Sequence, residues 1–111
     1  MSGIIDKTNA AEKLKDQGKL DEAVALLNEI LAEDPDHVLT HLTLGRIFTL
    51  QGNFDQAVEH GQKACELEPT DAFNFAALSV TYQRVFAGTG EQKYIQLAED
   101  AMAESRRLES L

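Results

Sequence analysis

The segment Gly18-Lys19-Leu20-Asp21-Glu22-Ala23-Val24 returns 34 residues later as Gly52-Asn53-Phe54-Asp55-Gln56-Ala57-Val58. The same interval relates Leu14 to Phe48 and Pro35 to Pro69. A fixed period of this length is typical of proteins that stack small helical units. Each unit is too small to bury its own apolar face, so its neighbours must cover it. The repeat therefore predicts an elongated stack with an extended binding surface.

Apolar residues at 3-and-4 spacing predict six helices, which we place at 4–17, 20–33, 37–51, 54–68, 72–86 and 91–108. Glycine favours the left-handed conformation that follows a helix end, so Gly18 and Gly52 mark two of the ends. Proline pushes the preceding residue out of the helical region, so Pro35 and Pro69 mark two more. Residues 87–90, which contain two glycines, form the remaining break.

The third and fifth helices carry apolar residues around most of their circumference, which predicts that both are central. Asp36 is expected to cap the third helix, and Thr70 or Asp71 the fifth. The sixth helix has a single apolar face and is expected to close the stack. The residues expected on that face are Tyr94, Leu97, Ala98, Ala101, Met102 and Leu108.

Composition fits a single domain with a core, because 111 residues include 43% hydrophobic side chains. The formal net charge of -9 argues against nucleic acid and anionic membranes as partners. No signal peptide is expected, since Met1-Ser2-Gly3 lacks a basic segment and Lys7 soon interrupts the pair Ile4-Ile5. The only cysteine, Cys65, is expected to be a buried inert thiol. These features together indicate a cytoplasmic protein without membrane insertion.

With these motifs the chain resembles the tetratricopeptide repeat (TPR) proteins, whose unit is an antiparallel helix pair. The first repeat, about 4–37, matches through Ala11, Leu14, Gly18, Ala23, Leu27 and Pro35. The second, about 38–71, matches through Leu44, Gly45, Phe48, Gly52, Ala57, Ala64 and Pro69. The third, about 72–111, lacks the expected glycine near Phe86 and has its packing alanine, Ala98, late, which indicates an insertion near 86–92. The resemblance implies an all-α, right-handed solenoid of three antiparallel helix hairpins in one domain, 1–111.

The resemblance also implies that the first helix of each repeat lines a concave face. From the first repeat, this places Ile5, Thr8, Glu12 and Lys15 there. The second repeat would add Leu39, Leu42, Thr43, Arg46 and Thr49, and the third Phe73, Ala76, Ala77, Val80 and Gln83. An apolar face of this kind suits a peptide segment, with Arg46 holding one acidic group. The alternative is that part of this face, including Leu39 and Phe73, packs as core.

Some TPR proteins hold acidic chaperone C-termini in a two-carboxylate clamp of Lys, Asn, Asn, Lys and Arg. The corresponding positions here are Thr8, Glu12, Thr43, Phe73 and Ala77, so we do not expect that clamp.

Other chemistry has little support. His37 and His41 have a spacing compatible with one metal ion, but no third ligand is defined, although Asp36 and His60 are conceivable. Gly88-Thr89-Gly90 lacks the strand and the Lys-Ser/Thr pair of a phosphate loop. We therefore expect neither an enzyme nor a metal or cofactor.

The sequence predicts a noncatalytic interaction module or scaffold that binds a peptide segment of a partner protein. The expected contact set is Leu39, Leu42, Arg46, Phe73, Ala76 and Val80. The alternative is a structural protein that forms homo-oligomers through its groove or its terminal helices.

Overall fold

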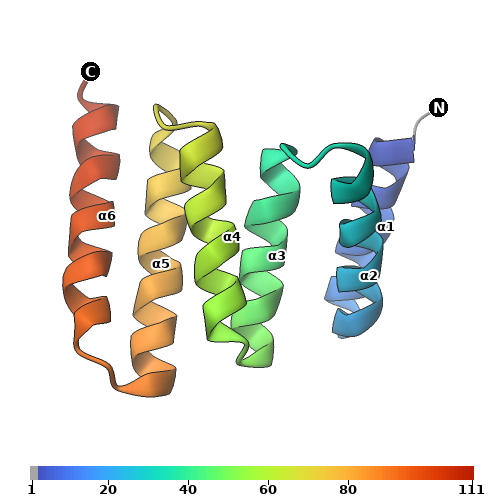
Figure 1. Ribbon diagram of the computed structural model, residues 1–111, viewed down its shortest axis with the longest axis horizontal. Coiled ribbons are helices and arrows are strands. Elements are labelled where there is room, and N and C mark those ends of the chain that lie inside the picture. The colour runs from blue at the N-terminus through green and yellow to red at the C-terminus, as the bar shows by residue number, and fades with distance from the viewer. Residues whose placement is uncertain (1–2) are drawn as a thin grey trace.

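The computed structural model describes residues 3–111, which form six helices and no strand. In chain order these are α1 (Gly3–Asp16), α2 (Leu20–Glu33), α3 (Val38–Gln51), α4 (Phe54–Leu67), α5 (Ala72–Thr89) and α6 (Lys93–Glu109), as Figure 1 shows. The prediction that no signal peptide is present used Met1 and Ser2, and these two residues lie outside the described part of the chain. Within residues 3–111, no helix is both long enough and apolar enough to cross a membrane.

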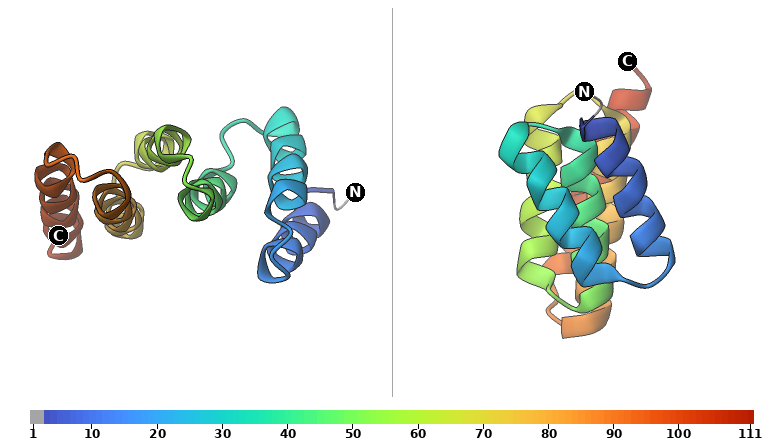
Figure 2. Two further views of the ribbon diagram at one scale, coloured as in Figure 1. Left: turned by 90° about the horizontal axis from the view of Figure 1, so that it is seen from below. Right: turned by 90° about the vertical axis from the view of Figure 1, so that its right-hand side faces the viewer.

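The helices form three antiparallel hairpins that follow one another along the long axis of the molecule (Figure 1). Contacts are densest within the pairs α1–α2, α3–α4 and α5–α6. The hairpins join through contacts of α2 with α3 and of α4 with α5, and α3 also contacts α5 directly. Figure 2 (left) shows α3 and α5 on one side of the stack and α4 on the other. The predicted all-α solenoid of three hairpins is therefore confirmed.

Left-handed glycines close each hairpin. Gly18, Gly52 and Gly90 have φ values of 79°, 78° and 72°. At the second of these turns the N–H of Asn53 donates to the carbonyl oxygen of Phe48, with an N–O distance of 2.8 Å. Such a bond satisfies a carbonyl that has no partner inside the helix. The same glycine conformation therefore ends the first helix of all three hairpins.

Two predicted helix boundaries are wrong in the third hairpin. Helix α5 does not end at Phe86 but continues through Gly88 to Thr89, and α6 begins at Lys93 instead of Glu91. The helix continues because Gly88 keeps a helical conformation, while Gly90 alone has a positive φ. A glycine inside a helix weakens it without necessarily ending it.

Capping agrees with the prediction for α5 but not for α3. The N–H of Phe73 donates to Asp71 Oδ1 at 2.9 Å, so Asp71 is the cap. The residue preceding α3 is His37, and its side chain makes no capping bond. The N–H of Asp36 instead donates to Asp34 Oδ1 at 3.2 Å, within the interhairpin turn. Asp36 is therefore part of a turn and does not cap the helix.

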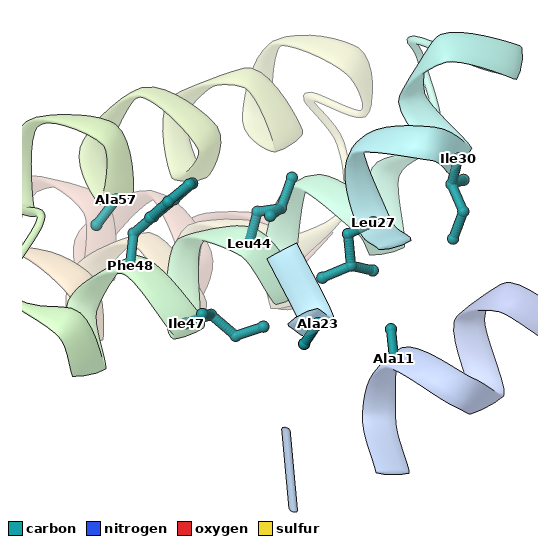
Figure 3. Packing of buried hydrophobic residues seen from close by; sticks show 8 residues of the cluster. All are labelled: Ala11, Ala23, Leu27, Ile30, Leu44, Ile47, Phe48 and Ala57. Carbon is teal, nitrogen blue, oxygen red and sulfur yellow. The ribbon is translucent and has the colours of Figure 1, made fainter. Parts of the chain in front are cut away.

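Small residues let the helices of each hairpin approach closely. Ala11, Ala23 and Ala57 are completely buried. An ideal Cβ on Gly45 would lie 3.4 Å from the carbonyl oxygen of Ala57, so α3 and α4 are almost in backbone contact. Larger side chains fill the space around these contacts, and Figure 3 shows how Leu27, Ile30, Leu44, Ile47 and Phe48 from α2 and α3 surround them.

A second apolar cluster joins the last two hairpins. It contains Cys65 from α4, Leu78 and Tyr82 from α5, and Ala98 and Ala101 from α6. Burial is the main reason that the pKa of the Cys65 thiol rises to about 11, and nearby Asp71 and Glu66 add to it. The thiol is therefore protonated at neutral pH, as expected for an inert cysteine.

The inward face of α6 is narrower than predicted. Ala98 and Ala101 are buried, and Tyr94, Met102 and Leu108 are partly buried. Leu97 is 37% exposed, so its assignment to the inward face is wrong. The cause is that α5 covers only the side of α6 that carries Ala98, Ala101 and Ser105.

Candidate functional site

An apolar cavity lies between α3 and α5, on the side of the stack opposite α4. Its volume is about 410 Å³. Helix α3 contributes Leu42, Gly45, Arg46, Thr49 and Leu50 to its lining. Helix α5 contributes Phe73, Ala76, Ala77, Val80, Thr81 and Arg84. We call this site the α3–α5 groove.

The back of the groove forms where α4 approaches α5 closely. Gly61 of α4 and Leu78 of α5 complete the lining. An ideal Cβ on Gly61 would lie 3.0 Å from Leu78 Cδ1, so only glycine leaves room for this leucine in its present position. The two residues thereby fix how deeply α5 sits against the second hairpin.

Five of the six residues of the expected contact set lie in this groove: Leu42, Arg46, Phe73, Ala76 and Val80. The sixth, Leu39, is 52% exposed on α3 but does not line the cavity. Phe73 is 61% exposed and Val80 is 43% exposed. The alternative that Leu39 and Phe73 pack as core is therefore wrong.

Several other residues expected on the concave face lie elsewhere. Thr43 is buried, and its hydroxyl donates to the carbonyl oxygen of Leu39 at 2.9 Å. Gln83 lines a second groove on the far side of α5 and donates to Ser79 Oγ at 3.3 Å. Residues expected from the first repeat, among them Ile5 and Glu12, do not line the α3–α5 groove. The Glu12 carboxylate instead pairs with Lys15 at 3.2 Å.

Arg84 lines the groove but was not among the residues expected on the concave face. It lies seven residues after Ala77 and four after Val80, so it shares their face of α5. The 3-and-4 spacing allowed either Gln83 or Arg84 to continue this face, and Gln83 was the residue expected there. Leu50 was missed similarly, although it is 61% exposed at the groove.

The polar character of the groove comes from its two arginines. The hydroxyls of Thr49 and Thr81 donate to the carbonyl oxygens of Gly45 and Ala77, at 2.8 and 3.2 Å, within their own helices. Arg46 and Arg84 are exposed and make no ion pair or hydrogen bond to any residue in 3–111. Their guanidinium groups are therefore available to a ligand.

The histidines form hydrogen bonds with one another and with the backbone. His41 Nε2 lies 2.8 Å from the Pro35 carbonyl oxygen, and His41 Nδ1 lies 3.0 Å from His60 Nδ1. If Nε2–H donates to the carbonyl, the neutral His41 must accept from Nδ1–H of His60. The ring of His37 is engaged separately, with Nδ1 2.7 Å from Thr40 Oγ1. Among residues 3–111 no group of three metal-type ligands comes together.

The second groove lies between α5 and α6 and has a volume of about 700 Å³. Its apolar residues include Phe86, Tyr94 and Ile95, and its charged residues are Glu99, Asp100 and Arg106. It is more open and less apolar than the α3–α5 groove. We therefore treat the α3–α5 groove as the candidate site.

A model of the tetratricopeptide repeat matches residues 14–78, which is more than half of the chain. The chain belongs to the tetratricopeptide repeat family. Members of this family generally serve as noncatalytic protein-interaction modules, and the fold implies protein partners. No curated protein is similar enough to this sequence to count as a relative.

Solved structures share the fold at low sequence identity. TTC0263, a thermophilic TPR protein of Thermus thermophilus, is 19% identical and superposes with a TM-score of 0.81, over 95% of this chain and 56% of that chain. The structure named "MamA MSR-1 C2" is 20% identical with a TM-score of 0.76, over 96% of this chain and 57% of that chain. The present chain thus spans little more than half of the length of these proteins, and the likeness concerns the fold.

Proposed function

We propose that this chain is a noncatalytic scaffold module that binds a peptide segment of a partner protein in the α3–α5 groove. The observation that carries the proposal is Phe73, an aromatic side chain that is 61% exposed beside an apolar cavity of about 410 Å³. Exposed apolar residues that gather around a concavity are typical of protein-binding sites. The buried lone thiol of Cys65 accords with a cytoplasmic setting, which we keep as part of the proposal.

The proposed contacts are those of an apolar peptide face. Leu42, Ala76 and Val80 would receive aliphatic or aromatic side chains, with Phe73 and Leu39 at the rim. Arg46 would hold an acidic group, because its planar guanidinium matches a carboxylate. The ligand is not expected to be held by a chaperone-type carboxylate clamp, because the five clamp positions carry no cation.

Affinity capture from the native extract tests this proposal. Phe73→Glu places a charge in the groove at an exposed site, so it should abolish the capture of groove-dependent partners without changing the melting temperature. Arg46→Glu should weaken the same partners. Leu97→Glu is the matched control, because Leu97 is also exposed and apolar but lies on α6 outside the groove. Partners that bind equally well to wild type, Phe73→Glu and Arg46→Glu would contradict a groove site.

A structural role in homo-oligomers is the alternative function. It is favoured by exposed apolar residues toward both ends of the stack, namely Ile5 at 68%, Ile95 at 42% and Leu97 at 37% exposure. Light scattering over a concentration series separates the two functions. A mass that rises with concentration without added ligand, and that Ile95→Glu returns to the monomer value, would support self-assembly.

A further inference from the structure

The charge of the α3–α5 groove is opposite to that of the rest of the molecule. The chain has 19 acidic residues against 10 basic ones, and its formal net charge is -9. None of those acidic residues lines the groove, whereas Arg46 and Arg84 both do. A chance sample of this surface would contain more carboxylates than guanidinium groups. The groove is therefore a local cationic site within an anionic protein.

The two arginines lie on different helices at different heights. Arg46 follows Val38, the first residue of α3, by eight positions, and Arg84 follows Ala72, the first residue of α5, by twelve. Because α3 and α5 run in the same direction (Figure 1), Arg84 lies further along its helix. The difference of four residues corresponds to about 6 Å of helix rise. The two cations therefore lie on opposite sides of the groove, and Arg84 is about one helical turn further along it than Arg46.

Apolar surface fills the space between these cations. Leu50 follows Arg46 by one helical turn on α3, and Val80 precedes Arg84 by one turn on α5. The nearby hydroxyls of Thr49 and Thr81 are already bonded within their helices. A ligand that satisfies both guanidinium groups must therefore place apolar atoms between its acidic groups.

We propose that the groove selects an acidic segment of a partner protein in which an apolar anchor is flanked by two carboxylates. The anchor contacts Leu50 and Val80, and Arg46 and Arg84 each receive one carboxylate. This proposal rests on the proposed function of the same groove and adds the charge of the ligand and the role of Arg84. Nucleic acid does not fit, because two cations on an apolar surface cannot neutralise a run of phosphates.

Selection from a displayed library of random dodecapeptides tests the proposal. The wild-type chain should enrich peptides in which Asp or Glu lies on both sides of Leu, Ile, Val or Phe. Arg46→Glu and Arg84→Glu should each reduce the affinity of a selected peptide about tenfold, as expected for loss of a charge-assisted hydrogen bond. The double variant should instead enrich peptides with Lys or Arg beside the same apolar residues.

The control is Arg106→Glu, which makes the same charge change at an exposed site outside the groove. It should leave the affinity within about twofold, because a distant surface charge is screened by salt. Melting temperatures of all the variants should match that of wild type, since neither groove arginine has a partner within residues 3–111. Raising the salt concentration should weaken the wild-type complex but not that of an uncharged peptide.

The failures of the two proposals are distinguishable. Peptides that depend on Phe73 but bind Arg84→Glu as tightly as wild type would overturn the two-carboxylate proposal and leave the groove function standing. Enrichment of neutral or basic peptides by the wild type would do the same. If no enriched peptide is lost on Phe73→Glu, the groove is not a peptide site and both proposals fail.

Discussion

The third hairpin packs two helices against each other as the first two hairpins do, but its helices are longer. Helices α1 to α4 each have 14 residues, whereas α5 has 18 and α6 has 17. The left-handed glycine of the third hairpin, Gly90, follows Gly52 by 38 residues instead of the 34 that separate Gly52 from Gly18. Four added residues are about one helical turn, so the faces of α5 keep their orientation. The comparison shows that a repeat tolerates an insertion that adds a whole turn.

The second and third hairpins also differ in the chemistry of the contact between their two helices. In the second hairpin, Gly45 brings α3 against the backbone of Ala57, where an added Cβ would lie 3.4 Å from the carbonyl oxygen. In the third, Ser79 Oγ donates to the carbonyl oxygen of Ala98 at 2.8 Å. Ser79 follows Gly45 by one repeat period and has the equivalent role. The close approach is thus kept, but a hydrogen bond replaces the contact that glycine allows.

The added turn of α5 packs back on the second hairpin. An ideal Cβ on Gly88 would lie 2.3 Å from Phe54 Cζ, so the aromatic ring occupies the space beside this glycine. Gly88 therefore serves packing inside the helix, in contrast to Gly52 and Gly90, whose Cβ positions have nothing within 4 Å. The added turn of the longer hairpin thus contacts the second hairpin at Phe54.

The largest effect is expected where backbone meets backbone, at Gly45. Gly45→Leu should reduce the free energy of unfolding by about 3 kcal/mol, because overpacking must push α3 away from α4. Denaturant unfolding followed by circular dichroism measures the loss. Arg46→Leu is the matched control, since it makes the same residue at the next, exposed position of the helix. A loss below about 1 kcal/mol would show that the second hairpin is not closely packed at Gly45.

An intermediate loss of unfolding free energy, equal in size, is expected at the turns of the second and third hairpins. Gly52→Ala and Gly90→Ala should each cost about 1 kcal/mol, because a side chain in the left-handed conformation is strained even where space is open. Asparagine tolerates this conformation better, so Gly52→Asn and Gly90→Asn should cost less. Unequal losses for the two alanine variants, measured by the same unfolding curves, would mean that the longer hairpin depends on its turn differently.

The smallest loss of stability is expected from lowering the pH, and it should affect the second hairpin more than the third. Burial, and next the charge of His41, lower the pKa of His60 below the ordinary value of 6.5, while Glu59 opposes them. The unfolded chain therefore binds the proton more readily than the folded chain. This contribution to stability is complete above pH 6.5 and is lost as the pH falls below it toward the folded pKa.

Hydrogen exchange at two pH values measures where this loss occurs. Amides of α3 and α4, which carry His41 and His60, should lose protection as the pH falls through 6.5, while amides of α5 and α6 should change little. In His60→Leu the difference between the hairpins should disappear. Equal loss of protection in both hairpins of the wild type would contradict a local effect of the histidine pair.

The sequence predicted the regular part of the fold well because its signals are local. Gly18 and Gly52 readily adopt the left-handed conformation that ends a helix, and Pro35 and Pro69 disfavour continued helix, so boundaries near them were correct within one residue. The end of α5 was wrong by three residues. Gly88 was interpreted as a breaker, and the contact with Phe54 that explains its presence joins two helices and leaves no local pattern.

The candidate site was predictable in its helices but not in all its residues. The 3-and-4 spacing placed Phe73, Ala76 and Val80 on one face of α5, where the groove lies. It left open whether Gln83 or Arg84 continues that face, because each lies at a helical interval from Val80 or Ala76. The choice depends on how α5 is rotated between α3 and α6, and tertiary packing sets that rotation. Leu97 was misplaced for a similar reason, since only part of α6 is covered.

The shielded thiol of Cys65 has a practical consequence. It is the only cysteine of the chain, it is 7% exposed, and it lies in the apolar cluster that links α4 with α5. A thiol reagent reaches such a group only when neighbouring helices separate transiently. The rate at which a thiol reagent labels Cys65 therefore measures how often α4 and α5 separate beside the groove. No engineered probe is needed for this measurement.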